Sequence, residues 1–318
     1  MLKSTPRKIV LAACFLCIYG TSQATDVFRL EGYGPVSRAM GGTATAYDVG
    51  AGALLANPAT LSMTGPGSRL HVGLDLVNAD IDVRNRATDE TTSSDSHSKN
   101  RGPYVAPELA YTWSNGPLTL AAGAFAQGGL GTEYGSNSFL SRTPTGNASG
   151  LEMSSRLLVL DIPFALSYKV KDRLSIGASL DALWTGLNLN LLFGGDQVGA
   201  LIGAGRVQGS LLPVIGGLPA FDGAHVSFTK NQPIGSGAHA WGIGGRVGVT
   251  YAATERTTIG VSYQFESDLS DLKGKATVTA LDRMVGQDAL PGNVAIRDFQ
   301  LPALLSNGVG CGLGDQRL

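Results

Sequence analysis

Residues able to carry out chemistry are few in this 318-residue sequence, and none of them stands in a catalytic spacing. No serine lies in a G-x-S-x-G turn, and no H-E-x-x-H pair, P-loop or G-x-G-x-x-G run occurs. The four histidines are scattered at His71, His97, His225 and His239. We therefore predict no enzyme activity, no catalytic residue, no metal site and no cofactor. A hydrolase remains an alternative, because a triad is defined by geometry and not by sequence order.

Charge and glycine content narrow the class of protein. The formal net charge is -1, which gives no electrostatic reason to expect a nucleic acid partner. Charged residues make up 15% of the chain, below the roughly 25% usual in soluble domains, and glycine is abundant at 44 residues. This composition favours a β protein with one polar and one apolar face. Such a protein can reside in lipid although its average hydropathy is low.

The first 24 residues have the features of a signal peptide. Basic residues precede an apolar run at residues 9–19, and Ser22-Gln23-Ala24 forms a small-residue cleavage site before Thr25. Residues 11–14 also resemble a lipobox, but cleavage there would leave only about five apolar residues of the roughly 7–15 that a signal needs. After cleavage before Thr25, Cys311 is the one remaining cysteine, so we expect no internal disulfide.

The secondary-structure elements that would position any functional residue in this chain are β-strands. From residue 69 onward, segments of about ten residues alternate between apolar and polar side chains. In residues 158–170 the even positions are apolar and are expected to face lipid, whereas Asp161 and Ser167 lie on the opposite face. The predicted strands are residues 69–83, 104–113, 117–127, 158–170, 174–182, 241–251, 259–265 and 299–310.

Short and long connections alternate between these strands. The tight turns are residues 114–116, 171–173 and 254–256, and the long connections are residues 84–102, 130–154, 193–238 and 269–297. A soluble sandwich would show the same strand pattern, but this loop pattern is typical of outer-membrane barrels. We therefore predict an all-β fold, an antiparallel transmembrane outer-membrane β-barrel. Shifts of the alternation near residues 76–77 and 183–184 predict a bulge or an exit from the membrane.

Residues 28–63 carry a family resemblance, in the sequence FRLEGYGPVSRAMGGTATAYDVGAGALLANPATLSM. Through Phe28, SRAMGG at 37–42 and Asn57-Pro58-Ala59, they resemble the N-terminal hatch of the outer-membrane long-chain fatty acid and toluene/xylene channel family (the FadL/TodX type). The resemblance continues in order over nearly the whole mature chain. Its further segments are VAP at 105–107, GLGTEY at 129–134, WGIG at 241–244 and DFQLP at 298–302.

The resemblance implies a barrel of about fourteen strands whose lumen is plugged by the N-terminal segment. It implies that hydrophobic molecules reach an inner pocket near Phe28 and leave sideways through a gap at a kinked third strand. In this chain the part of the plug around Asn57, Pro58 and Ala59 would gate the inner pocket, and the proline would fix a bend there. Glycine weakens a strand, so we place the lateral gap where the third strand is expected to end, at Gly128, Gly129 and Gly131.

The excursion at residues 198–221 is unusually apolar for a loop. Apolar patches of this size on a surface usually bind something, and the family's corresponding loop helps to form an outer capture groove. Packing on the barrel rim is the alternative. The residues that we assign to capture are Leu201, Ile202, Leu211, Leu212, Ile215 and Phe221.

Two features depart from the family pattern. Only about eight strands are visible and the residues up to Leu318 do not form a final strand, so we expect a chain that lacks its C-terminal strands. Residues 187–191 carry no basic side chain to pair with a carboxylate, which favours neutral hydrocarbons over fatty acids.

The sequence therefore predicts a signal peptide at residues 1–24, a plug at residues 25–67 and a partial barrel at residues 68–318. We expect a passive channel for fatty acids or hydrocarbons in the outer membrane of a Gram-negative bacterium, reached after signal-peptide cleavage. Its expected partners are hydrophobic small molecules, outer-membrane lipid and the barrel-assembly machinery. An adhesin-like interaction protein and an outer-membrane lipid hydrolase are the alternatives.

Overall fold

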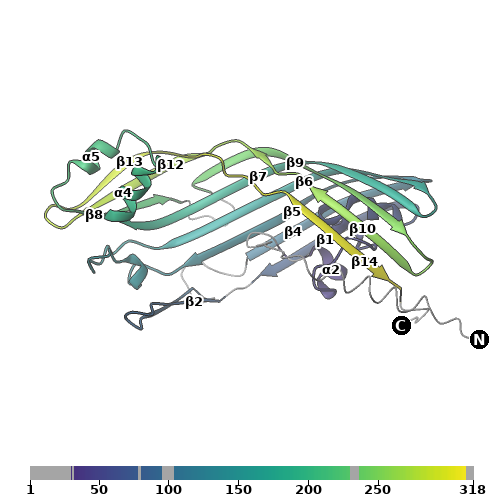
Figure 1. The fold of residues 1–318 in the computed structure, drawn as a ribbon, viewed down its shortest axis with the longest axis horizontal. Helices are drawn as coiled ribbons and strands as arrows, with labels where there is room; N and C mark the ends of the chain where they lie inside the picture. Colours follow the sequence, from purple (N-terminus) through teal and green to yellow (C-terminus); the bar gives the residue numbers. More distant parts are fainter. Residues whose placement is uncertain (1–29, 31, 78–79, 95–103, 230–235, 313–318) are drawn as a thin grey trace, which may run out of the picture.

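The computed structural model describes residues 30, 32–77, 80–94, 104–229 and 236–312, and the expected signal peptide and Phe28 lie outside them. A 12-stranded antiparallel sheet dominates this part of the chain (Figure 1). Its strand order is β1-β4-β5-β6-β7-β8-β12-β9-β10-β14, with β7 also paired to β9. Neighbouring strands therefore mostly follow one another in sequence, as in a barrel wall built from hairpins.

All eight predicted strands are present, and the all-β antiparallel fold is confirmed. They are β1 (Gly67–Val77), β4 (Tyr104–Asn115), β5 (Leu118–Glu133), β6 (Ser154–Lys171), β7 (Leu174–Gly194), β9 (Ala238–Ala252), β10 (Thr257–Gln264) and β14 (Leu304–Cys311). Each tight turn that the sequence predicts joins two of these strands. β5, β6, β7 and β9 are longer than the alternation indicated, whereas β1 ends earlier and β14 begins later than predicted.

Exposed apolar side chains cover the outer face of the sheet. On β1, Leu70 is 70% exposed and Val72 is 73% exposed, and on β6 the side chains of Phe164 and Leu166 point outward in the same way. On the opposite face of β6, Asp161 and Ser167 are fully buried. An apolar outer band with a polar interior is the arrangement that lets a sheet contact lipid, as the alternation predicts. Leu160 and Ile162 share the outer face and are half-buried.

The connections that the sequence treated as loops contain further structure at one end of the molecule. The excursion after β7 holds α4 (Gly195–Gly203), α5 (Leu212–Gly216) and β8 (Phe221–Phe228). The connection after β10 holds β11 (Asp268–Leu269), β12 (Leu272–Asp282) and β13 (Gly286–Ile296). These elements extend the sheet at the end opposite to α2 (Gly34–Ala39), as Figure 1 shows. Their strands have weak alternation because they stand beyond the apolar outer band.

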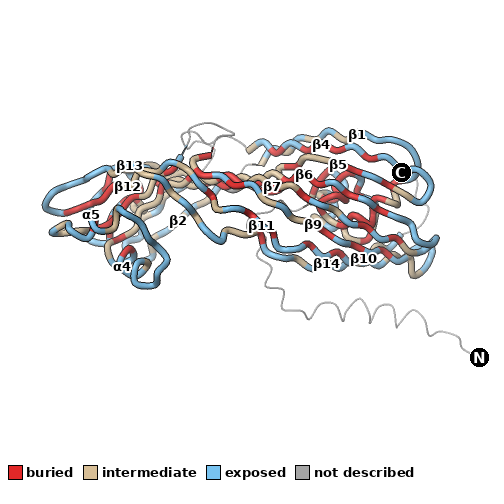
Figure 2. The backbone as a smooth tube through the Cα atoms, turned by 90° about the horizontal axis from the view of Figure 1, so that it is seen from above, coloured by how far each residue is buried: buried red, intermediate tan, exposed pale blue. Residues whose placement is uncertain are grey.

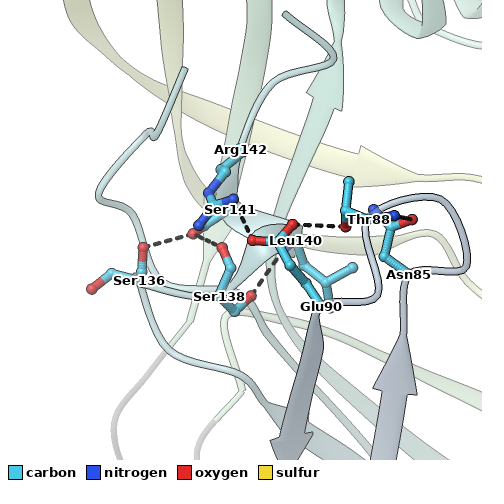
Figure 3. Close-up of polar contacts among 8 residues, drawn as sticks. All are labelled: Asn85, Thr88, Glu90, Ser136, Ser138, Leu140, Ser141 and Arg142. Atoms are coloured by element: carbon cyan, nitrogen blue, oxygen red, sulfur yellow. Dashed lines mark hydrogen bonds and ion pairs between the residues drawn. The ribbon is translucent and has the colours of Figure 1, made fainter. Parts of the chain in front are cut away.

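Polar contacts join separate connections at this end. The hairpin of β2 (Ile81–Arg84) and β3 (Thr91–Ser94) approaches the turn η3 (Phe139–Ser141), where Arg142 Nη1 lies 2.6 Å from Glu90 Oε1 (Figure 3). Asp222 accepts hydrogen bonds from Thr143, Thr145 and Asn147. Although desolvation opposes ionisation, these hydrogen bonds lower the pKa of Asp222, so the carboxylate keeps the connection docked at neutral pH.

Two predictions about strand irregularity need correction. Pairing of β6 with β7 runs through Leu183 and Trp184 without a register shift, so the bulge is absent there and the alternative, an exit from the membrane, stays a prediction. The alternation changes because Leu183 faces inward into an apolar cluster and is 2% exposed. The third strand, β5, does not end at Gly128, Gly129 and Gly131 but continues to Glu133, after a register shift between Ala126 and Gly128. Near residues 76–77 the prediction of an exit agrees with the end of β1 at Val77.

The N-terminal segment packs against the inner face of the sheet. It contains α2, η1 (Gly50–Gly52), α3 (Ala53–Ala56) and η2 (Pro58–Met63). Leu54 and Leu61 are fully buried and form a core with inward side chains of β4, β5 and β6, including Phe125. Figure 2 shows buried chain gathered inside this end of the sheet. Within the described ranges, no helix is long and apolar enough to cross a membrane.

Candidate functional site

A cavity of about 360 Å³ lies between the N-terminal segment and the sheet. Leu30, Tyr33 and Leu55 contribute apolar surface from the N-terminal side. The sheet contributes Gln127 from β5 and Arg246 from β9, together with residues of β10 and β14. Small-molecule sites span roughly 300–1,000 Å³, so this cavity suits a compact ligand. Its remaining lining residues are Gly32, Ser37, Gly41, Gly42, Thr43, Ala44, Thr45, Ala56, Ser262, Gln264, Leu304 and Ser306.

Asn57 fixes one part of the N-terminal segment to the sheet. Its side-chain nitrogen donates to the carbonyl of Thr45 at 2.7 Å and reaches the carbonyls of Val249 and Val261, each at 3.4 Å. Its side-chain oxygen accepts from the backbone of Ala59 at 3.0 Å. Asn57 is fully buried, so these bonds supply partners that water cannot reach.

Glycines of the sheet let the backbone of this segment approach closely. A Cβ at Gly248 would overlap Asn57, one at Gly177 would overlap Pro58 and Ala59, and one at Gly260 would overlap the carbonyl of Thr45. Gly177 and Gly248 are also partners in the pairing of β7 with β9. We call these three residues the docking glycines. They explain part of the high glycine content, because only glycine leaves room for another backbone at these positions.

A different contact holds the front of the N-terminal segment. The backbone of Leu30 donates to the carbonyl of Gln127 at 3.1 Å, and the hydroxyl of Tyr33 donates to the same carbonyl at 2.8 Å. Gln127 lies at the register shift of β5, so the bulge directs its carbonyl toward this segment. The ring of Tyr33 also packs edge-on against Phe125, with ring centres 6.1 Å apart.

The pairing of β4 with β5 stops beside this bulge. It runs from Asn115 and Leu118 as far as Glu108 and Phe125, whereas β5 continues its pairing with β6 to Glu133. Gly128, Gly129 and Gly131 therefore belong to a stretch of β5 that is paired with β6 on one side. On its other side this stretch has no paired residue of β4. The side chain of Tyr104 lies over Gly131, since a Cβ there would overlap its hydroxyl.

Charged side chains tie α2 to the strands on the same side. Arg38 lies 2.5 Å from Asp75 of β1, and the backbone of Gly34 donates to Glu108 of β4 at 3.2 Å. His71 of β1 lies 3.1 Å from the other carboxylate oxygen of Glu108. These contacts place α2 next to the point where the pairing of β4 with β5 stops.

Three charged residues meet inside the sheet. Arg246 of β9 lies 2.5 Å from Asp181 of β7 and 2.9 Å from Asp161 of β6. All three side chains are at most 2% exposed. A buried guanidinium needs such partners, because an unpaired charge in this environment is strongly unfavourable. The alternation placed Asp161 opposite the lipid-facing side chains of its strand but did not indicate that it pairs with Arg246.

Apolar side chains continue from the cavity toward the far end of the molecule. A cluster of inward residues contains Leu157, Val159, Leu183, Leu269 and Leu301. The side-chain amide of Gln300 donates to the carbonyl of Leu269 and accepts from its backbone nitrogen, at 3.0 and 2.8 Å. Barrel interiors are usually polar, whereas these side chains are buried against one another and form an apolar core inside the sheet.

The site residues suggested by the sequence do not form one cluster. Asn57, Pro58 and Ala59 lie in the docked part and do not line the cavity. In the excursion after β7, Ile215 is buried, Ile202 is exposed, and Leu201, Leu211, Leu212 and Phe221 are half-buried. Thus only part of this set is available to a ligand on the surface.

Sequence reasoning missed Tyr33, Gln127, Arg246 and the docking glycines. Two signals were available. Arg246 is a charged residue on a predicted inner face, and Gln127 directly precedes the glycine pair on β5. Neither signal names a partner, because Tyr33 and Gln127 are separated by 94 residues.

Comparisons with known proteins agree with this geometry. Residues 21–310 match the family model described as outer membrane protein transport protein (OMPP1/FadL/TodX). The crystal structure of the P. putida toluene transporter TodX is 41% identical, with a TM-score of 0.80, over 90% of this chain and 68% of that chain. The Ralstonia pickettii toluene transporter TbuX is 46% identical with the same TM-score, over 90% of this chain and 69% of that chain.

Two further comparisons are more limited. An uncharacterised protein of Chlorobium limicola, from the 5′ region of a phosphoenolpyruvate carboxykinase gene, is 39% identical over 90 residues. The match spans 27% of this chain and 44% of that relative, so less than half of its length is matched. A Pseudomonas aeruginosa FadL homologue is 13% identical with a TM-score of 0.54, over 91% of this chain and 67% of that chain, and shows the fold alone.

Proposed function

The chain belongs to the outer membrane protein transport family (OMPP1/FadL/TodX), and we propose that it is a passive outer-membrane channel for hydrophobic small molecules. Its solved relatives include toluene transporters and a monoaromatic hydrocarbon channel, not enzymes. In this proposal residues 1–24 direct export, residues 25–67 form the plug, and residues 68–318 contribute barrel wall. Barrel-assembly machinery and outer-membrane lipid are its partners during and after insertion.

The observation that carries the proposal is the interrupted pairing of β4 with β5 beside the cavity. The cavity is lined by Gln127, the residue at the bulge of β5, and the stretch 128–133 follows it. A molecule in the cavity is therefore next to the one segment of β5 that lacks ladder pairing with β4 among the described residues. A lateral opening in a barrel wall requires interrupted strand pairing. If the pairing were continuous, backbone hydrogen bonds between the two strands would have to break before a molecule could pass.

Lateral exit also follows from the solvation of the substrate. A hydrophobic molecule gains about 0.8 kcal/mol for each CH₂ group transferred out of water, so release into the aqueous periplasm is unfavourable. Passage from the cavity through the wall into the bilayer avoids this step. Transport down a gradient then needs no coupled energy source.

Capture takes place at the far end of the molecule. Ile202 of α4 is 39% exposed and Val214 of α5 is 49% exposed, and both belong to the apolar excursion after β7. The inward cluster around Leu183 and Leu269 then leads toward the cavity. In this proposal Leu201, Leu211, Leu212 and Phe221 support the capture surface from half-buried positions, and Ile215 packs beneath it.

We place the gate in the front of the N-terminal segment. The front part is held by hydrogen bonds to Gln127, by the ion pair of Arg38 with Asp75 and by packing of Tyr33 against Phe125. Residues 57–59 are held by packing against the docking glycines. A few polar contacts are easier to exchange than close backbone packing, so the front part moves while the docked part remains. Phe28, which precedes the front part, is proposed to contact the ligand.

The test fills the interrupted stretch of β5. We expect Gly129→Val to reduce uptake of toluene strongly, because its Cβ would stand 3.1 Å from the carbonyl of Leu157 and 3.3 Å from Leu158. Gly131→Val should act in the same direction through Tyr104. Gly312→Val is the matched control, because its nearest neighbour would be 3.8 Å away.

Uptake is measured in cells and folding by the mobility of unheated protein in gels. Unchanged toluene uptake in both folded variants would reject lateral exit and favour an axial route past a displaced plug. Equal losses in Gly312→Val would show that the effect is not specific to the gap.

A further inference from the structure

We propose that Asp161 and Asp181 are specificity-determining residues that make the cavity reject carboxylates. This inference rests on the proposed function, since it concerns the substrate class of the same cavity. Both aspartates neutralise Arg246, the one charged residue among the described residues that line the cavity. A hydrophobic molecule with an anionic head therefore finds no net positive charge there.

The geometry of the three residues is that of a closed charge cluster. Each comes from a different strand of three neighbouring strands, β6, β7 and β9, and each points to the interior. One terminal nitrogen of Arg246 faces Asp181 at 2.5 Å and the other faces Asp161 at 2.9 Å. Both terminal nitrogens of the guanidinium are thus engaged by carboxylates, while its Nε has no hydrogen-bond partner among the described residues.

The charge of the cluster decides what it can bind. Two carboxylates surround one guanidinium, so the cluster is negative when both are ionised and neutral when one carries a proton. In neither state is it positive. An incoming carboxylate would have to leave water for a site without net positive charge, and burying an uncompensated charge is strongly unfavourable.

The other lining groups do not change this conclusion. Ser262, Gln264 and Ser306 are polar and uncharged, and Leu30, Leu55 and Leu304 are apolar. Such a lining accepts a neutral molecule with a polarisable ring and gives no ion pair to an acid. The structure thus assigns the preference for neutral ligands to two residues that do not themselves line the cavity.

The experiment changes the charge and leaves the shape. The variant that combines Asp161→Asn with Asp181→Asn keeps the size of both side chains and leaves the positive charge of Arg246 unopposed, whereas either single substitution would leave a neutral pair. A carboxylate could then form a charge-assisted hydrogen bond with Arg246, so binding of benzoate should strengthen about tenfold or more. Binding of toluene, which has a similar ring and no charge, should change much less.

Binding is measured on purified protein in detergent with toluene and with benzoate, at low salt and neutral pH. Asp172→Asn is the matched control, because Asp172 lies exposed in the turn between β6 and β7. A gain for benzoate in the double interior variant, with no gain in the control, supports the proposal. A folded double variant that binds toluene and gains nothing for benzoate overturns it.

Two further measurements keep the outcomes separate. If wild-type protein binds neither ligand, the proposed function fails before specificity is at issue. If the double interior variant does not fold, Gln264→Lys provides a second test. This variant adds a cation to the cavity lining while the charge cluster stays intact, and it should also gain benzoate binding. Failure of that folded variant to gain benzoate binding would show that charge does not control selection, and would overturn the inference.

Discussion

Two regions of the wall use glycine in opposite ways. At Gly177, Gly248 and Gly260 the strands are fully paired, and glycine creates space for the backbone of the N-terminal segment. At Gly128, Gly129 and Gly131 the strand is paired on one side only, and glycine follows a bulge. The first region packs against the N-terminal segment, and the second leaves β5 without a β4 partner on one side. The difference shows that glycine content alone does not identify a gate, because the neighbouring ladder decides its effect.

The same contrast divides the N-terminal segment. Its docked part has fully buried side chains, with Asn57, Ala59, Thr60 and Leu61 at 0% exposure. Its front part is more open, since Val36 is 46% exposed and Met40 is 54% exposed. If this contrast is functional, changes in the docked part should alter stability, and changes in the front part should alter passage.

The largest effect is expected at a docking glycine. Gly260→Val would drive a side chain into the carbonyl of Thr45, so the docked part must shift. Overpacking of this kind costs about 1–3 kcal/mol or more, and backbone cannot rotate away as a side chain can. Chemical denaturation in detergent should show the loss, and proteolysis should cut the N-terminal segment faster. Equal stability of Gly260→Val and the open-site variant Gly312→Val would contradict the docking role.

The next effect is expected at Asn57. Asn57→Ala removes the donor to Thr45, Val249 and Val261 and the acceptor for Ala59. Leaving buried groups without partners costs roughly 1–3 kcal/mol each, although local shifts and water will recover part of this. The free energy of unfolding is the measurement, and hydrogen exchange of the Ala59 amide should speed up. Asn137→Ala, an exposed position in the connection after β5, serves as the control.

A smaller effect on stability is expected at the front part. Tyr33→Phe removes one of the two hydrogen bonds to the carbonyl of Gln127 and keeps the ring against Phe125. The loss should be about 0.5–1.5 kcal/mol, because Leu30 still donates to that carbonyl. Hydrogen exchange near residue 30 should increase, and toluene uptake should rise if the front part is the gate. A fall in uptake with normal folding would place Tyr33 in ligand binding instead.

The smallest effect is expected at the ion pair of Arg38 with Asp75. Both side chains are partly exposed, so water screens the pair, and Arg38→Gln should cost only about 0–1 kcal/mol. High salt should remove the difference between wild type and variant. A change in uptake without a change in the free energy of unfolding would support a role of the front part in passage and not in stability. A loss as large as that of Asn57→Ala would mean that the front part is as firmly held as the docked part.

The structure also changes how the facing of β6 should be tested. The alternation predicts that Ile162→Arg disturbs a lipid-facing position more than Ser167→Arg disturbs the interior. Ser167 does face inward, but it is fully buried and donates to the carbonyl of Ala59 at 3.1 Å. An arginine there would displace the docked plug, so both substitutions should be severe and their comparison no longer isolates the lipid face.

The sequence by itself determined the strands, their facing and the family. Period-two alternation reports local backbone geometry, and ordered motifs such as Asn57-Pro58-Ala59 report relatedness, so neither needs the tertiary structure. It also located the glycines of β5, although it placed the end of that strand too early.

Only the tertiary structure decided which residues act together. The cluster of Asp161, Asp181 and Arg246 joins three strands, and the contact of Tyr33 with Gln127 spans 94 residues. Pairing across such distances depends on strand register and on a one-residue bulge, which the alternation does not encode. For the same reason, the role of each glycine became clear only when its neighbour in space was known.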